Sequence, residues 1–283
     1  MTMTNTPPPA QQLYTPTNAI LELPSYSNLI VGIEGYGGTG KTAAALTFPN
    51  PIIAIFEKPD LEGLLSLEHL KEVKPILLPF YSNSWLDRNN WPKYEAPRPA
   101  TYRAYDPAGC FKRWLDSEGQ KLSNQQTLVL DNWTRLQELF DEVNWGWDSI
   151  TNKGEVDHFA PWDRKLSFCE EVSNALISLP CNVVVLFHEV QERDKATGVL
   201  LDKLQPLTQG KFIAKLKTYY PNFFRQHVIR EEKDGKPTGD RKFVWQVKHT
   251  ASFDPKCSRP HLMTPTAPTY VEANYKTLLP PQS

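Results

Sequence analysis

One glycine-rich segment has the residue types and the spacing of a phosphate-binding loop: Gly35-Tyr36-Gly37-Gly38-Thr39-Gly40-Lys41-Thr42. Glycines let the backbone turn tightly and direct several N–H groups toward one point. The ammonium group of Lys41 can then reach the β- and γ-phosphates of a nucleotide, and the hydroxyl group of Thr42 can bind Mg²⁺. The alternative is a glycine-rich turn that only resembles such a loop. A buried strand before the segment and a helix after it favour the phosphate loop, so we expect ATP and Mg²⁺ as cofactors.

Three polar residues directly follow predicted buried strands, at the edge where active sites of parallel sheets lie. Asp131 follows 127–130 and can hold the Mg²⁺ or its water, or else cap the helix that starts near Trp133. Glu57 follows 52–56, a strand that we expect beside the phosphate loop; it either orients the attacking water as a base or is a solvated loop residue. His188 follows 182–187 and either senses the γ-phosphate by a hydrogen bond or caps its strand.

Short apolar runs alternate with segments of helical spacing along the middle of the chain. The predicted strands are 29–33, 52–56, 76–80, 127–130 and 182–187, and the predicted helices are 41–48, 61–71, 111–121, 133–143 and 163–179. Residues 223–230 and 242–248 are expected to form a later strand pair around a turn at 234–237. Alternating strands and helices are typical of an α/β fold, in which helices cover both faces of a mainly parallel sheet. The late pair would add antiparallel strands at one edge.

We expect one ATPase domain over residues 26–262 between two tails. Residues 1–25 are rich in Pro, Thr and Asn, which indicates a flexible segment. Residues 263–283 are rich in proline and form either an extended arm on a neighbouring surface or a disordered tail. Residues 81–106 combine several aromatic residues with prolines, and this insertion either packs on the body of the domain or provides a binding surface.

Composition excludes several classes of protein. The net charge of about −1 over 283 residues argues against a uniformly basic nucleic-acid binder. The four cysteines, Cys110, Cys169, Cys181 and Cys257, lack the spacing of a zinc site and are typical of free thiols in a reducing compartment. No apolar run is long enough to span a bilayer, and the N-terminus lacks the pattern of a signal peptide. We therefore expect a cytoplasmic protein without a membrane partner.

The order of these parts resembles the RecA-like ATPase core, and more narrowly the phage nucleotide-binding proteins of the Sak type, which are linked to single-strand annealing and recombination. The resemblance spans about residues 27–260 and implies a three-layer αβα P-loop NTPase core. It also implies that Glu57 is the catalytic glutamate and that His188 occupies the sensor position. In the family, two lysines near the end of the core reach the γ-phosphate of a neighbouring subunit; here Lys248 matches the first, and Thr250 replaces the second.

The resemblance further implies partners. RecA-like proteins assemble into rings or filaments with ATP between subunits, and they hold single-stranded DNA with two loops. The first loop corresponds to 145–162, with Trp147, Lys153 and His158, and the second to 191–211, with Arg193, Lys195, Lys203 and Lys211. The first loop also holds Asp148, Glu155, Asp157 and Asp163, so its charge is nearly balanced. A single-strand binding protein is a further implied partner, and the location would be the host cytoplasm if a phage encodes the chain.

Three functions compete at this stage. The favoured one is a Mg-ATP hydrolysing recombination protein that acts on single-stranded DNA, with turnover stimulated by the DNA. The second is an ATP-binding oligomeric regulatory or assembly protein with little turnover and no DNA contact, which the near-neutral charge and the aromatic insertion favour. The third is a small-molecule kinase, which the scarcity of arginines in 191–211 disfavours.

Overall fold

The computed structural model describes residues 28–56, 73–80, 106–144, 159–194, 197–233 and 236–280. Several predictions fall outside these ranges. They concern the tail 1–25, the helix 61–71, nearly all of the insertion 81–106, the residues Trp147, Lys153, His158 and Lys195 that were expected to contact DNA, and Glu57, the expected catalytic glutamate.

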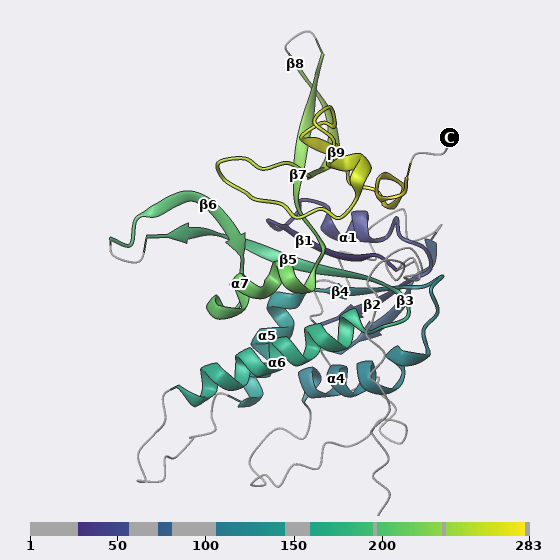
Figure 1. The fold of residues 1–283 in the computed structure, drawn as a ribbon, viewed down its shortest axis with the longest axis vertical. Coiled ribbons are helices and arrows are strands. Elements are labelled where there is room, and N and C mark those ends of the chain that lie inside the picture. The colour runs from purple at the N-terminus through teal and green to yellow at the C-terminus, as the bar shows by residue number, and fades with distance from the viewer. Residues whose placement is uncertain are drawn as a thin grey trace, which may run out of the picture.

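The described strands form one nine-stranded sheet of the predicted α/β type (Figure 1). Its strands are β1 (Ile30–Gly35), β2 (Pro51–Ile55), β3 (Ile76–Pro79), β4 (Thr127–Asp131), β5 (Asn182–Arg193), β6 (Leu200–Pro206), β7 (Asn222–Lys233), β8 (Lys236–Gln246) and β9 (Tyr270–Glu272). The order is β3-β2-β4-β5-β1-β7-β8-β9, and β6 pairs with β5. The pairs among β3, β2, β4, β5, β1 and β7 are parallel. Their apolar runs are nearly continuous because both faces of these strands are buried.

This order corrects one expectation. The strand before Glu57 was expected beside the phosphate loop, but β4 and β5 separate β2 from β1. The nearest neighbours of β1 are β5 and β7, with Gly35 level with His188 and Glu34 level with Arg225. The strands that can contribute directly to the loop are therefore the fifth and the seventh.

Helices lie on both sides of the sheet. They are α1 (Lys41–Ala45), α4 (Pro107–Ser117), α5 (Trp133–Asn144), α6 (Ala160–Ile177) and α7 (Gly210–Tyr219), with short 3-10 turns at Gly119–Lys121, Pro260–Leu262 and Tyr275–Leu278. In Figure 1, α4, α5 and α6 lie below the sheet and α1 lies above it. The start of α4 shows local control by sequence, because the Asp106 carboxylate accepts a hydrogen bond from the Gly109 N–H at 2.9 Å and Pro107 occupies the first turn. α1 is shorter than the predicted helix 41–48.

Buried apolar residues form two cores, and the one that includes α1 is called the second core here. The C-terminal segment forms part of this second core. Residues from β9 and the turn after it, including Val271, Ala273 and Leu278, pack with α1 and with the strand residues on that face. β9 also adds to the edge of the sheet by pairing with β8. The described part of 263–283 is therefore neither disordered nor an arm on another surface, because its apolar residues cover a sheet face that α1, only five residues long, leaves open.

Two antiparallel hairpins extend the parallel sheet. β7 and β8 form the predicted late pair, which points to the top of Figure 1, and it is longer than predicted at both strands. β5 and β6 form a second hairpin that points to the left of Figure 1, and its register runs from Glu189–Pro206 to Arg193–Leu200. The predicted second DNA loop, 191–211, is therefore mostly a β-hairpin and the first turn of α7, because the apolar run of β5 continues beyond residue 187.

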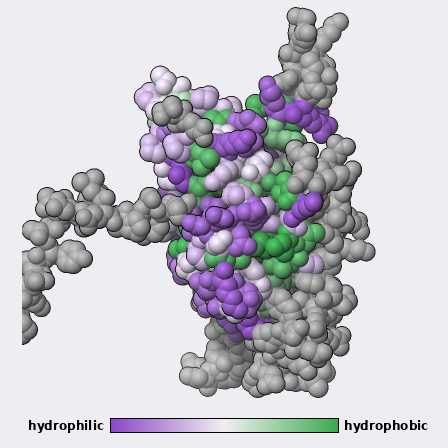
Figure 2. All heavy atoms as spheres, turned by 90° about the vertical axis from the view of Figure 1, so that its right-hand side faces the viewer, coloured by the Kyte–Doolittle hydropathy of each residue, from purple (hydrophilic) through white to green (hydrophobic). Residues whose placement is uncertain are grey.

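The outer face of the molecule is that of a globular domain. On the side that faces right in Figure 1, hydrophilic residues cover much of the coloured surface, and hydrophobic residues gather in smaller patches among them (Figure 2). None of the described helices has the length and apolar character needed to cross a membrane.

Cys169 and Cys181 are buried, and burial raises the pKa of Cys169 to about 12 and that of Cys181 to about 11, so both stay protonated thiols.

Candidate active site

The phosphate loop follows β1 directly and has the backbone that its glycines predict. Gly38 and Gly40 have φ angles of 77° and 78°, a left-handed conformation that side chains disfavour. A Cβ atom added at Gly40 would lie 2.6 Å from the ring of Phe243 in β8, so a glycine is needed there for space as well. At Gly37 and Gly38 no described atom lies within 4 Å of such a Cβ, so this part of the loop is open to a ligand.

Lys41 and Thr42 lie where a nucleotide would need them. The Lys41 ammonium group donates hydrogen bonds to the carbonyl oxygens of Gly35, at 2.7 Å, and Tyr36, at 2.9 Å, and only 8% of the residue is exposed. The Thr42 hydroxyl group donates to the Asp131 carboxylate at 2.7 Å, although 89 residues separate the two in the chain. The topology thus joins the end of the phosphate loop to the end of β4.

This arrangement fits magnesium nucleotide. A hydroxyl and a carboxylate oxygen that already lie within hydrogen-bond distance are the hard oxygen ligands that Mg²⁺ prefers, directly or through water. The buried ammonium group of Lys41 donates to two neutral carbonyl oxygens, and a phosphate oxygen would give it a stronger, charge-assisted bond. Thr42 and Asp131 would therefore hold the metal, and Lys41 with the loop amides would hold the phosphates.

The other predicted residues are placed differently. His188 lies at the level of Gly35 on the neighbouring strand and is half-buried, so it is next to the loop. Lys248 follows β8, which runs antiparallel to β7, and its ammonium group donates to the Pro265 carbonyl oxygen at 3.0 Å. Gln246 pairs with Arg225, which is level with Glu34, and β8 runs away from the phosphate loop at that point. Lys248 therefore lies toward the end of the strands that is opposite to the loop of its own chain. Glu57 lies outside the described residues.

Two buried residues of the β7–β8 hairpin, Gln226 and Trp245, hold the loop, and neither was predicted from the sequence. The Gln226 side chain in β7 is 1% exposed, and its amide N–H donates to the Thr39 carbonyl oxygen at 2.8 Å. The Trp245 indole N–H in β8 donates to the Gln226 side-chain oxygen at 3.1 Å. The β7–β8 hairpin therefore fixes the middle of the phosphate loop. Nothing in the local sequence marks Gln226 for this role, since it depends on strand pairing between distant segments.

A buried charge cluster lies on the opposite face of β1. Arg225 in β7 donates two hydrogen bonds to the Glu189 carboxylate in β5, at 2.8 and 3.0 Å. Between these strands, Glu34 is fully buried, and its two carboxylate oxygens have no hydrogen-bond partner among the described residues. Burial and, secondarily, the Glu189 charge raise the pKa of Glu34 from 4.5 to about 8. The sequence signal was available, because an acidic residue interrupts the apolar strand directly before Gly35.

Comparison with known proteins supports this reading of the loop. Residues 27–220, more than half of the chain, match the model of a family described as AAA domain. No curated protein matched the chain.

Among solved structures, an ATPase of the type III secretion system of pathogenic bacteria is 10% identical, with a TM-score of 0.38, and covers 72% of this chain and 54% of its own. The type III secretion ATPase EscN of enteropathogenic E. coli is 11% identical, with a TM-score of 0.37, and covers 71% and 43%. The flagellar accessory protein FlaH of Methanocaldococcus jannaschii is 11% identical, with a TM-score of 0.34, and covers 81% and 79%. The chain thus spans about half the length of the two secretion ATPases.

Proposed function

The chain belongs to the AAA domain family, and from this premise we propose that it binds Mg-ATP and hydrolyses it at the phosphate loop. The observation that carries the proposal is the 2.7 Å hydrogen bond between the Thr42 hydroxyl group and the Asp131 carboxylate. It brings the two expected oxygen ligands of magnesium together at the end of the loop that holds Lys41. A glycine-rich turn without a nucleotide role has no need of this pairing.

Each residue of the site has a part in this proposal. When bound, magnesium neutralises charge on the phosphates, and Thr42 and Asp131 hold it. Lys41 and the loop amides stabilise the charge that develops on the transferred phosphoryl group, which is the main source of catalysis in such sites. His188 lies level with Gly35 and senses the γ-phosphate by a hydrogen bond. Glu57 orients the attacking water, a role that rests on the resemblance to RecA-like cores.

The finer proposal is that this ATPase is a phage recombination protein that acts on single-stranded DNA and assembles into a ring or filament. Its support is the resemblance of the sequence. The charges of the β5–β6 hairpin add little to it, because Lys203 pairs with Glu192 at 3.2 Å and Lys211 with Asp163 at 3.8 Å. One contact favours a link between hairpin and nucleotide site: the Thr134 hydroxyl group, just after Asp131, donates to the Leu207 carbonyl oxygen at 2.9 Å.

Removal of the loop ammonium group tests the ATPase. We expect Lys41→Ala to lose ATP hydrolysis by at least about 100-fold, since it removes a positioned charge from the phosphates. Lys121→Ala is the matched control, because this lysine is 69% exposed in its side chain and pairs with Glu118 in a surface turn. Circular dichroism melting of both variants checks the fold. Full hydrolysis by folded Lys41→Ala would overturn the mechanism.

A second experiment separates the recombination protein from a nucleotide-binding assembly protein. ATP turnover is measured at low salt with and without a single-stranded oligonucleotide, and fluorescence anisotropy of the labelled oligonucleotide is followed in parallel. The DNA role predicts both a rise in turnover and a rise in anisotropy. If neither changes and turnover stays low, the assembly protein is the better description. Size-exclusion chromatography with a non-hydrolysable ATP analogue then tests self-association, and a strictly monomeric complex would exclude Lys248 acting on a neighbour's nucleotide.

A further inference from the structure

The most unusual polar group among the described residues is the carboxyl group of Glu34. The residue has no exposed surface, and neither of its carboxylate oxygens has a hydrogen-bond partner in the part of the chain that the structure describes. A buried carboxylate without a partner is costly, because the protein interior replaces its hydration poorly. Proteins rarely keep such a group unless something else pairs with it.

The two described cations that act on Glu34 already have partners. Arg225, which is level with Glu34 on β7, uses Nε and one Nη for both oxygens of Glu189. Lys217 of α7 forms an ion pair with Asp254. Neither Arg225 nor Lys217 donates a hydrogen bond to Glu34, so this carboxyl group stays without a partner among the described residues.

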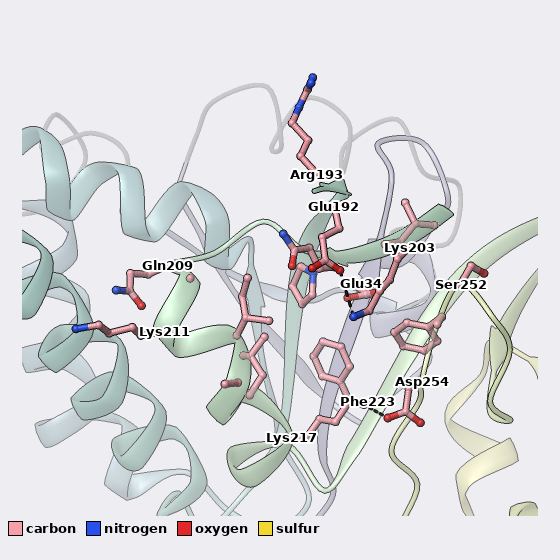
Figure 3. Close-up of a pocket in the computed structure, with 18 of the residues that line it drawn as sticks. Glu34, Glu192, Arg193, Lys203, Gln209, Lys211, Lys217, Phe223, Ser252 and Asp254 are labelled. Carbon is pink, nitrogen blue, oxygen red and sulfur yellow. Dashed lines mark hydrogen bonds and ion pairs between the residues drawn. The ribbon is translucent and has the colours of Figure 1, made fainter. Parts of the chain in front are cut away.

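Glu34 also lines a cavity of about 1240 Å³, which is large enough to hold a small organic ligand. In Figure 3, Glu34 lies between the β5–β6 hairpin residues Glu192 and Lys203 on one side and Phe223 on the other. No residue of the phosphate loop itself is among the described residues that line it. The cavity is therefore separate from the nucleotide site, although Glu34 is covalently next to Gly35.

The walls are mostly apolar and aromatic, and two lysines at the rim form ion pairs. The apolar and aromatic lining includes Phe159, Trp162, Leu204, Ile213, Phe223 and Phe253. At the rim, Lys203 pairs with Glu192 and Lys211 with Asp163. The Arg193 guanidinium, also at the rim, donates to the Gly198 carbonyl oxygen at 3.3 Å. Among the described lining residues, Glu34 is the one whose buried side-chain oxygens have no partner, so its carboxyl group can select a ligand by charge.

We propose that this cavity binds an organic cation, a guanidinium or ammonium group on an aliphatic stem, which pairs with Glu34 at its base. A charged donor makes a stronger hydrogen bond to a carboxylate than a neutral donor does. The stem packs on the aliphatic wall, and Phe159 or Trp162 adds attraction between cation and ring. A divalent metal fits less well, because it needs several oxygen ligands, and no cluster of three possible metal ligands occurs among the described residues.

Binding also carries a proton signature. Since the pKa of Glu34 is raised to about 8, the group is mostly protonated at pH 7, and pairing with a cation ionises it. The charged groups that act on it are Glu189 from β5, Arg225 from β7 and Lys217 from α7. The complex therefore releases most of one proton at pH 7.

Isothermal titration calorimetry of the nucleotide-free full chain tests the proposal with two probes. Agmatine represents a free small cation, and the peptide acetyl-Gly-Arg-Gly-amide represents a side chain of a protein partner. The same peptide with citrulline in place of arginine keeps the shape and removes the charge. We expect at least one of the two cationic probes to bind wild type, and the citrulline peptide to bind at least tenfold more weakly than its arginine counterpart.

The variant Glu34→Gln keeps the size of the side chain and removes its charge, and we expect it to weaken the cationic probe at least tenfold. Glu138→Gln, an exposed carboxylate on α5, is the matched control and should leave binding within twofold. Repeating the wild-type titration in buffers of different ionisation enthalpy measures the released proton, which does not depend on any variant folding. The probe that binds more tightly identifies the source of the cation. The proposal would be overturned if neither probe binds at about 10 mM. Equal binding by wild type and Glu34→Gln, or binding without proton release, would overturn it as well.

Discussion

Replacement of Glu34 by glutamine gives a quantitative test of the buried carboxyl group, independent of any ligand. Glutamine has the same shape, so the substitution removes the titration and little else. The pKa of Glu34 is 4.5 as a free side chain and about 8 in the folded chain, because burial disfavours the charged form. The folded state therefore binds the proton more tightly than the unfolded state between these two values.

The sign and size of the effect follow from this difference. Because the pKa of this acid is raised by folding, the free energy of unfolding falls as pH rises from about 4.5 through about 8. The gap of 3.5 units, 8 minus 4.5, corresponds to at most about 5 kcal/mol well above pH 8. Of this, about 2 to 3 kcal/mol is lost between pH 5 and pH 7, and about 1 more by pH 9. Glu34→Gln escapes this loss, so its stability relative to wild type should rise with pH.

Urea denaturation at pH 5, 7 and 9, followed by tryptophan fluorescence, measures this difference for wild type and Glu34→Gln. The comparison cancels the titration of all other groups, provided that the slopes of the two curves agree. Glu138→Gln should change stability by less than about 0.5 kcal/mol at each pH, since its carboxylate is exposed. A stability difference between Glu34→Gln and wild type that is flat across the three pH values would refute the account of a carboxyl group kept neutral by burial.

Three other substitutions test the site and the fold. Asp131→Asn should weaken magnesium-dependent nucleotide binding at least about tenfold in a titration with a fluorescent ATP analogue, since it removes a charge from the metal position, and unchanged magnesium dependence would contradict the metal role. Trp245→Phe leaves the buried side-chain oxygen of Gln226 unpaired and should lower the free energy of unfolding by about 1 to 3 kcal/mol in urea, with a rise in KM for ATP as the loop loosens; an unchanged KM would mean that the contact is only structural. Leu278→Ala should cost about 2 to 5 kcal/mol because this side chain is fully buried, whereas Leu279→Ala, 39% exposed, should cost less than about 0.5, and equal values would place residues 263–280 outside the core.

Local sequence predicted the parts whose physics is local. The glycines, Lys41 and Thr42 form a continuous segment, so the phosphate loop could be recognised before any strand order was known. The apolar runs of β1, β4 and β5 likewise identified a buried parallel sheet, and its α/β class is confirmed.

The parts that failed depend on pairing between distant segments. The sequence gives no direct sign that β2 lies three strands from β1, which moved the strand before Glu57 away from the loop. Proline-rich composition suggested a tail after residue 262, but a few spaced apolar residues, Val271 and Leu278 among them, were enough to bind it to the second core. In the first case strand pairing decided the position, and in the second tertiary burial overrode a local signal.

β1 lies between β5 and β7, so the phosphate loop has a neighbouring strand on each side. On one side, Gln226 of β7 holds the Thr39 carbonyl oxygen; on the other, β5 places His188 level with Gly35, and the His188 carbonyl oxygen accepts a hydrogen bond from the Leu207 N–H at 2.7 Å. Both neighbouring strands continue into hairpins beyond the sheet. We infer that a partner that bends the β7–β8 hairpin shifts the loop through the hydrogen bond between Gln226 and Thr39. By thermodynamic reciprocity, a nucleotide that shifts the loop changes the affinity for that partner by the same factor.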